Sequence, residues 1–460
     1  MITLYLARVI GPESFGFVGM LMIFILLAES VVNGGFSQAL VQKSNHLTEE
    51  DASTIFYVNL IWGVFVYILL YFSAPYIAEF YKQPELIDIS RILFLVVIIN
   101  SFTVVVRAKL TIKIDFKSQA IAGTLATLFS SIFSIWLVEF DYGYWSLVYY
   151  ILSKSILNSI ILWFFCKWLP QFIFSSNSLR SLFKFGSYLM IAGFVATFVN
   201  NLYVALVGKY FNATSVGYFT QATTLTNALS GVISSTLQGV TYPIMTSVKE
   251  DKERLVNIYK QLISITMLVS LPLLIGFAGI SDSFVKVFLG DEWLPTIPLL
   301  VALSFARAIT PISAINMNIL NAVGRSDLFL KIDLLKLPMT LLALFIALPF
   351  GIEALAWAMV CTSFIAFFIN AYYPYKLFNF GAIQQLKIAS NYILSSILMY
   401  VIMNMIDIEL EVLNLIVKIA IGIIVYYLFL LIVKDTLFIK VNKDIIKFIK
   451  NKKGISKNGK

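Results

Sequence analysis

Charged residues are scarce in this sequence. Only 13% of its 460 residues are Asp, Glu, Lys or Arg, whereas 59% are hydrophobic. Soluble globular domains carry roughly a quarter charged residues, so this chain has too little polar surface to cover a globule of its size. The composition therefore excludes an ordinary soluble protein.

Histidine and cysteine are almost absent as well. The single histidine, His46, lies in a polar segment, which excludes a histidine-rich metal site and argues against a histidine proton relay. The two cysteines, Cys166 and Cys361, fall inside apolar blocks, which argues against a disulfide framework or a cysteine metal site. The sequence also lacks a Ser-His-Asp set and a phosphate-binding glycine loop. We predict no metal, no cofactor and no catalytic residues.

Long apolar blocks occupy most of the chain. Many of them run for 18 to 24 residues, and a helix needs roughly 20 apolar residues to cross a bilayer. Lipid forces each backbone group to bond within its own segment, which favours helices, and the alternating pattern of a β-barrel is absent. We predict an all-α polytopic membrane protein with about fourteen transmembrane segments, the first of them truncated. The segments are 1–10, 15–32, 53–73, 90–107, 118–138, 144–166, 184–206, 215–239, 260–280, 294–318, 328–349, 352–374, 388–406 and 412–433.

Lysines and arginines are distributed unevenly over the loops between these segments. Alternate loops are basic, as in the run Arg107, Lys109, Lys113 and Lys117, whereas the opposite loops carry more Asp and Glu. Because basic loops stay on the cytoplasmic side, we expect these loops and both termini to be cytoplasmic. Single bases near the ends of segments, such as Lys418, are expected to extend toward the membrane surface.

The basic tail, residues 434–460, holds nine lysines and two aspartates. Phe438, Val441, Ile445 and Phe448 recur among these lysines at helical spacing. This pattern predicts a cytoplasmic interfacial helix on anionic membrane lipid. Nucleic-acid binding is the alternative explanation of the formal charge of +9, but the loop bias already explains it, and we predict no nucleic-acid partner.

The sequence contains an internal repeat. Residues 9–17 match residues 210–218 at an offset of 201: each stretch has an apolar pair, a small polar turn, and a glycine followed by an aromatic residue. Residues 143–147 match 351–355 at an offset of 208, and the turn at 113–117 has a counterpart at 325–327. The order predicts two parallel six-helix lobes, 1–168 and 184–376, around a central cavity, plus two additional helices within 388–433.

The chain resembles the polysaccharide-export flippases of the MOP superfamily. The resemblance implies transport of undecaprenyl-pyrophosphate-linked oligosaccharide from the cytoplasmic to the outer leaflet of a bacterial inner membrane, by alternating access, for O-antigen or exopolysaccharide biosynthesis. It also implies a polysaccharide polymerase and a chain-length regulator as partners. The motifs that carry the resemblance are Ala7-Arg8-Val-Ile-Gly-Pro-Glu-Ser-Phe-Gly16, Gly35-Phe-Ser-Gln-Ala-Leu-Val-Gln42, Arg107-Ala-Lys-Leu110, Gly143-Tyr-Trp-Ser-Leu147 and Val216-Gly-Tyr-Phe219.

Two basic residues fall near the middle of predicted membrane segments. Lys154 lies at the centre of segment 144–166, and Arg307 lies at mid-depth in segment 294–318, one turn before Pro311. A charge at this depth costs about 2.5–3.5 kcal/mol on insertion scales, so such residues tend to face a cavity. Arg and Lys both bind phosphate. We therefore predict a pyrophosphate site at Lys154 and Arg307, with a structural ion pair as the alternative role for each.

Two other charged residues are weaker candidates. Arg8 lies beside the first outer turn and is predicted to contact the pyrophosphate or to anchor the helix at the interface. Glu29 lies toward the cytoplasmic end of its segment and is predicted to couple transport to a proton or cation, or to pair with a neighbouring helix.

Three other functions are considered. A multidrug or cation exporter of the same superfamily would favour buried acids over buried bases. A lipid II-type flippase has nearly the same substrate chemistry. A membrane glycosyltransferase or polymerase would need paired carboxylates over its substrate, and no such pair appears in the short outer loops, so we expect the chain not to be an enzyme.

Overall fold

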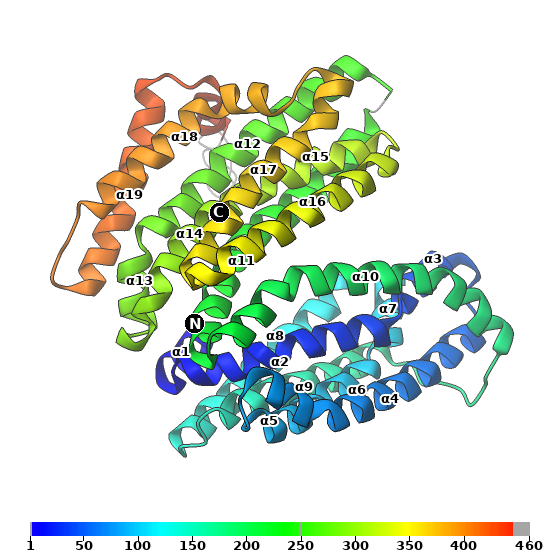
Figure 1. Ribbon diagram of the computed structural model, residues 1–460. Helices are drawn as coiled ribbons and strands as arrows, with labels where there is room; N and C mark the ends of the chain where they lie inside the picture. Colours follow the sequence, from blue (N-terminus) through cyan, green and yellow to red (C-terminus); the bar gives the residue numbers. More distant parts are fainter. Residues whose placement is uncertain (1, 249, 445–460) are drawn as a thin grey trace, which may run out of the picture. The chain divides into compact units, whose positions relative to one another are not determined.

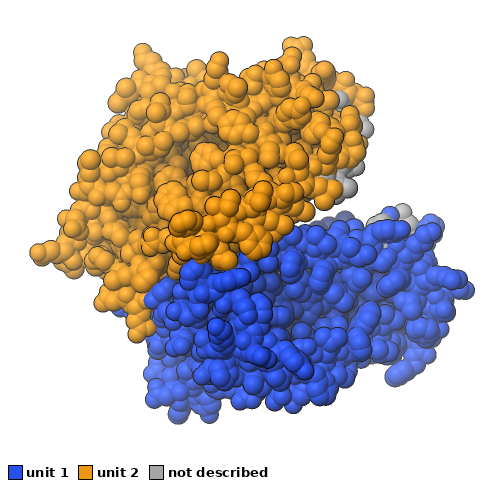
Figure 2. Space-filling view, viewed as in Figure 1, with its two compact units in different colours: residues 1–220 blue, residues 221–460 orange. Residues whose placement is uncertain are grey.

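The computed structural model describes residues 2–248 and 250–444. The elements within these residues are helices, which confirms the all-α prediction. Their packing separates the chain into two compact units, residues 1–220 and 221–460, coloured separately in Figure 2.

Unit 1 is built from ten helices and the first turns of an eleventh (Figure 1). The longest of them, α4 and α10, have 33 and 35 residues, and α10 packs along α2 and also contacts α3 and α4. The helices are α1 (Ile2–Ile10), α2 (Pro12–Asn33), α3 (Phe36–Gln42), α4 (Glu49–Tyr81), α5 (Leu86–Leu93), α6 (Leu95–Ser101), α7 (Val104–Ile112), α8 (Phe116–Glu139), α9 (Trp145–Cys166), α10 (Ser176–Tyr210) and α11 (Ala213–Ser247).

Unit 2 contains the rest of α11, eight further α-helices and a helix that begins in the tail. The last two of the eight, α18 and α19, correspond to the predicted additional helices, and α18 packs lengthwise on α12. The helices are α12 (Lys252–Gly279), α13 (Ser281–Phe288), α14 (Ile297–Ala308), α15 (Thr310–Ala322), α16 (Ser326–Ala347), α17 (Ile352–Phe378), α18 (Ala382–Asn404) and α19 (Glu411–Ile432).

Twelve segments of the described chain are long and apolar enough to cross a membrane. The chain is therefore a multi-pass membrane protein, but the predicted number of fourteen spans is not confirmed. The two predicted spans outside this set are α1, with nine residues, and α11. Helix α11 is long enough at 35 residues, but 13 of them are Ser or Thr, which lowers its hydropathy.

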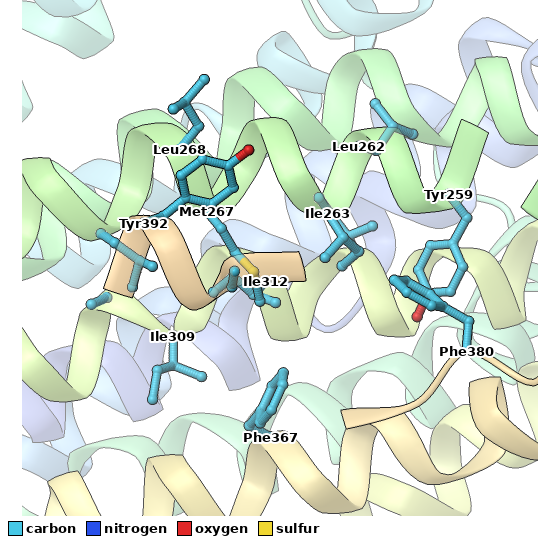
Figure 3. Packing of buried hydrophobic residues seen from close by; sticks show 14 of the residues in the cluster. Tyr259, Leu262, Ile263, Met267, Leu268, Ile309, Ile312, Phe367, Phe380 and Tyr392 are labelled. Atoms are coloured by element: carbon cyan, nitrogen blue, oxygen red, sulfur yellow. The ribbon is translucent and has the colours of Figure 1, made fainter. Parts of the chain in front are cut away.

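The core of unit 2 joins α12, α14, α15, α17 and α18 (Figure 3). At one end of it the rings of Tyr259 and Phe380 meet edge to face, with centroids 5.2 Å apart. The hydroxyl of Tyr259 donates to Asn316, and the amide of Gln385 donates to both of these residues. All three polar side chains are buried, so this network fixes α18 against α12 and α15 without leaving its donors unpaired.

The tail begins as a helix over residues 436–444. Phe438 and Val441 pack against the core of unit 2, and the backbone N–H of Phe438 donates to the carboxylate of Asp435. The apolar face predicted for a membrane surface is thus partly used for packing within the protein. Ile445 and Phe448 lie outside the described residues.

Packing places the boundary between the units at residues 220–221, with α10 in unit 1, whereas the predicted lobes 1–168 and 184–376 rest on the repeat and remain a prediction. The prediction that Lys418 extends to the membrane surface is wrong. Its side chain is 3% exposed and its Nζ lies 2.9 Å from the carboxylate of Asp282.

Candidate functional site

Two membrane spans of unit 1 are interrupted helices. The span Pro12–Gln42 consists of α2 and α3, which are separated by Gly34 and Gly35. Both glycines have left-handed backbone angles, with φ of +50° and +68°, a conformation that glycine adopts without steric cost. The span Leu86–Ile112 is likewise broken, between α6 and α7. Interrupted helices expose backbone and polar side chains at membrane depth, where transporters commonly place their sites.

The first cavity of unit 1 lies beside both interrupted spans and α9. It has a volume of about 370 Å³ and its charged lining residues are Glu29, Arg107 and Lys154. Lys154 therefore lines a cavity, whereas its predicted role in binding a pyrophosphate stays a prediction. The neutral polar lining residues are Asn100, Ser155 and Asn158, with Tyr150 close to Lys154.

Neither base of this cavity forms a salt bridge within the described part of the chain, although Arg107 and Glu29 are close enough to attract each other electrostatically. Lys154 is exposed, and its Nζ lies 5.7 Å from the centroid of the Tyr150 ring. Arg107 is also exposed, and no described residue forms an ion pair with either base. Glu29 instead accepts a hydrogen bond from the side-chain amide of Asn100. The cavity therefore holds two bases, neither of them in a salt bridge among the described residues, beside one hydrogen-bonded carboxylate. This excess of positive charge suits an anion.

A second cavity of about 280 Å³ adjoins the first, because both are lined by Glu29, Asn100 and Arg107. It lies at the two helix interruptions. Its other lining residues are Asn33, Ser37, Gln38, Thr103 and Val104.

The structure brings together two of the four residues predicted from sequence, Lys154 and Glu29. Arg8, at the end of α1, is exposed and lines neither cavity of unit 1, so its contact with a pyrophosphate remains a prediction. Arg307 belongs to unit 2, and its sharing of a cavity with Lys154 also remains a prediction.

Arg307 lies at another interruption, where α14 ends at Ala308 and α15 begins at Thr310. The helix is therefore interrupted at Ile309, two residues before Pro311. The backbone carbonyl of Ala308 accepts a hydrogen bond from the hydroxyl of Ser270. The Nε of Arg307 is buried and has no hydrogen-bond partner among the described residues, so this guanidinium is not neutralised by a local ion pair.

Sequence reasoning did not identify Arg107 and Asn100 as cavity-lining residues. Arg107 stands at the end of an apolar block, so its sequence position predicts a cytoplasmic loop charge. Its neighbour in the chain, Lys109, does pair with Glu49 near the helix ends. The polar residues Asn100, Ser101 and Thr103 inside an otherwise apolar block were the available signal for a break and a lined cavity.

Comparison with known proteins places the chain among polysaccharide biosynthesis proteins. Teichuronic acid biosynthesis protein TuaB of Bacillus subtilis is 28% identical over 75% of this chain and 72% of its own length. Succinoglycan biosynthesis transport protein ExoT of Rhizobium meliloti is 21% identical over 94% of this chain and 89% of its own. Lipopolysaccharide biosynthesis protein WzxC of Escherichia coli is 22% identical over 72% and 68%.

The fold is similar to solved transporter structures. A structure of the lipid II flippase MurJ in an inward closed conformation matches 94% of this chain and 96% of its own, with a TM-score of 0.76 and 16% identity. An inward-facing multidrug transporter of the MATE family and MOP superfamily matches 89% of this chain and 96% of its own, with a TM-score of 0.63 and 16% identity. The model of the family described as polysaccharide biosynthesis protein matches residues 5–298, and the chain belongs to this family.

Proposed function

We propose that the protein flips undecaprenyl-pyrophosphate-linked oligosaccharide repeat units from the cytoplasmic to the outer leaflet, for O-antigen or exopolysaccharide biosynthesis. The observation that carries this proposal is the pair of basic residues, Arg107 and Lys154, in a cavity among membrane-spanning helices. A polyprenyl pyrophosphate is an anion that must pass through such a region. Arg can hold a phosphate through two hydrogen bonds, whereas Lys contributes a point charge.

The family and its relatives support the same class of substrate. The relatives' names refer to the biosynthesis of teichuronic acid, succinoglycan and lipopolysaccharide. Two lobes rocking about a central cavity would expose the site alternately to each side of the membrane. In this proposal Arg307 and Arg8 contact the pyrophosphate from other parts of the path, and Glu29 couples transport to a proton or cation.

The balance of charge in the site disfavours a multidrug or cation exporter. Two of the three charged lining residues of the first cavity are basic, and two bases would repel a cationic substrate. A lipid II-type flippase would use the same pyrophosphate chemistry. The two functions are distinguished by which polyprenyl-linked intermediate accumulates when the gene is lost. We propose no catalytic step for the protein, since transport alone requires none.

The remaining parts of the proposal concern the protein's surroundings. We propose a bacterial inner membrane location with both termini cytoplasmic, because the basic loops and the lysine-rich tail lie on the same predicted side. The tail beyond residue 444 would bind anionic lipid. A polysaccharide polymerase and a chain-length regulator would act on the flipped unit.

The test is complementation of a strain that lacks the gene. Variants Lys154→Ala, Arg107→Ala and Arg307→Ala should each reduce surface polysaccharide strongly while the protein still reaches the membrane. Lys387→Ala, at an exposed lysine of α18, serves as the matched control and should retain full activity. Normal polysaccharide in all three site variants would refute the site. If the deletion strain accumulated no lipid-linked saccharide, the function itself would be refuted.

A further inference from the structure

The two adjoining cavities of unit 1 differ in chemistry. The first contains Lys154 and shares Arg107 with the second. The part of the second cavity that is not shared has no ionisable lining residue, and its polar groups are amides and hydroxyls. A charged pocket is thus joined to a neutral polar one at Glu29, Asn100 and Arg107.

We propose that the second cavity is a subsite for the first sugar of the lipid-linked headgroup. This inference rests on the proposed function and adds to it the place where the substrate's sugar is recognised. A pyrophosphate held by Arg107 and Lys154 is bonded directly to that sugar. The sugar must therefore lie in the space next to the two cations, and the second cavity is such a space.

The hydrogen-bonding groups of the second cavity are available. Asn33 and Gln38 are exposed, Ser37 is half-buried, and none of the three side chains has a hydrogen-bond partner among the described residues. An amide side chain both donates and accepts, so it can pair with a sugar hydroxyl in either direction. The carboxylate of Glu29 can accept from a further hydroxyl. Ligand sites commonly use such a small number of placed polar groups for specificity.

The volume of the second cavity limits the occupant. Pockets for drug-sized ligands have volumes of about 300–1,000 Å³, and the second cavity, at about 280 Å³, lies just below that range. It suits one sugar ring rather than an oligosaccharide. Later sugars of the repeat unit would lie outside it, so this subsite contacts only the sugar that is attached to the lipid.

The order of the two cavities along unit 1 fits a lipid in the cytoplasmic leaflet. Lys154 lies near the middle of its helix, whereas Ser37 and Gln38 lie on α3, which leads to the loop predicted to be cytoplasmic. A lipid in that leaflet carries its sugar on the cytoplasmic side of its pyrophosphate. Along unit 1, Lys154 and the amides of the second cavity lie in the same order as the pyrophosphate and the sugar of such a lipid.

The experiment measures whether the protein distinguishes a sugar-bearing lipid from a bare one. The full chain in nanodiscs is titrated with undecaprenyl pyrophosphate, and with the same lipid carrying one N-acetylglucosamine or one galactose. The variants are the double substitution Asn33→Ala with Gln38→Ala, the single substitution Lys154→Ala, and the control Gln83→Ala in the loop between α4 and α5. Thermal unfolding of each variant establishes that it is folded.

We expect the wild type to bind at least one sugar-bearing lipid more tightly than the bare lipid. The double variant should lose about tenfold in affinity for it, because two side-chain hydrogen bonds are removed, while its affinity for the bare lipid stays unchanged. Lys154→Ala should weaken the binding of both lipids, whereas Gln83→Ala should change the affinity for neither. A structural role for the amides would alter both affinities together.

Two results would overturn the subsite and leave the proposed function standing. One is equal binding of bare and sugar-bearing lipids by the wild type, and the other is a preference that survives in the double variant. If the wild type bound none of the polyprenyl pyrophosphates, the proposed function would fail instead. The two failures are therefore distinguishable.

Discussion

Gly16 and Gly217 make reciprocal contacts with each other's helix. A Cβ atom on Gly16 would lie 1.8 Å from the carbonyl oxygen of Ala213, and one on Gly217 would lie 1.9 Å from that of Pro12. Pro12 and Ala213 differ by 201 residues, and so do the two glycines. This reciprocity is the pattern of a two-fold contact between equivalent surfaces, here between two copies of one motif at the starts of α2 and α11.

The first prediction concerns this helix crossing. Gly16→Ala places a methyl group against backbone rather than against a flexible side chain, so the helices must separate. Overpacking of this kind costs about 1–3 kcal/mol, occasionally more. We expect a lower unfolding temperature in detergent and less folded protein in the membrane. Gly231→Ala in α11 meets no atom within 4 Å and should be neutral or slightly stabilising, and equal behaviour of the two variants would contradict the close crossing.

The second prediction concerns the buried pair of Lys418 and Asp282. Asp282→Asn leaves a lysine that is 3% exposed without its carboxylate, and removal of one partner of a buried pair costs about 3–5 kcal/mol. The partial exposure of Asp282 reduces this to the lower end of the range. Adding Lys418→Met to the same chain removes the isolated charge and should restore most of the unfolding temperature.

The control for this pair is its neighbour, Lys286 with Glu411. These side chains are 36% and 35% exposed, and exposed pairs contribute about 0–1 kcal/mol. The hydrogen bond from Lys286 to Glu411 raises the pKa of the lysine above its ordinary value, but solvent screens the pair. Glu411→Gln should therefore change the unfolding temperature little. If Asp282→Asn were as mild as Glu411→Gln, the buried pair would not contribute as argued.

The composition of the chain was sufficient to predict an all-helical membrane protein, because membrane insertion depends on local apolar length. The composition was not sufficient to predict which charged side chains form ion pairs with one another. Lys418 and Asp282 are 136 residues apart, and no local pattern connects them. The same holds for Arg107, whose position in a cavity depends on the break between α6 and α7. The position of Lys154 beside a cavity was predictable, because a charged side chain at the centre of an apolar block has few other ways to reach water.

The third prediction concerns the buried network of Tyr259, Asn316 and Gln385. Tyr259→Phe removes the hydroxyl that donates to Asn316 and accepts from Gln385. Buried polar groups left without a partner cost about 1–3 kcal/mol, so the unfolding temperature should fall. Tyr188→Phe, at a tyrosine that is 73% exposed, makes the same chemical change at the surface and should have no effect. A stability loss at both positions would indicate an effect of the substitution rather than of the network.

The last prediction concerns the turn between α7 and α8. Ile114 has φ of +56°, a left-handed conformation that costs roughly 1–2 kcal/mol for a residue with a Cβ atom. Its side chain is 76% exposed, so little packing holds it there. Ile114→Gly should therefore raise the unfolding temperature, offset in part by the greater freedom of glycine in the unfolded chain. Ile114→Ala removes most of the side chain but keeps the Cβ atom, and it should give no such gain. A similar rise for both variants would mean that loss of the exposed apolar surface, and not relief of the backbone, stabilises the protein.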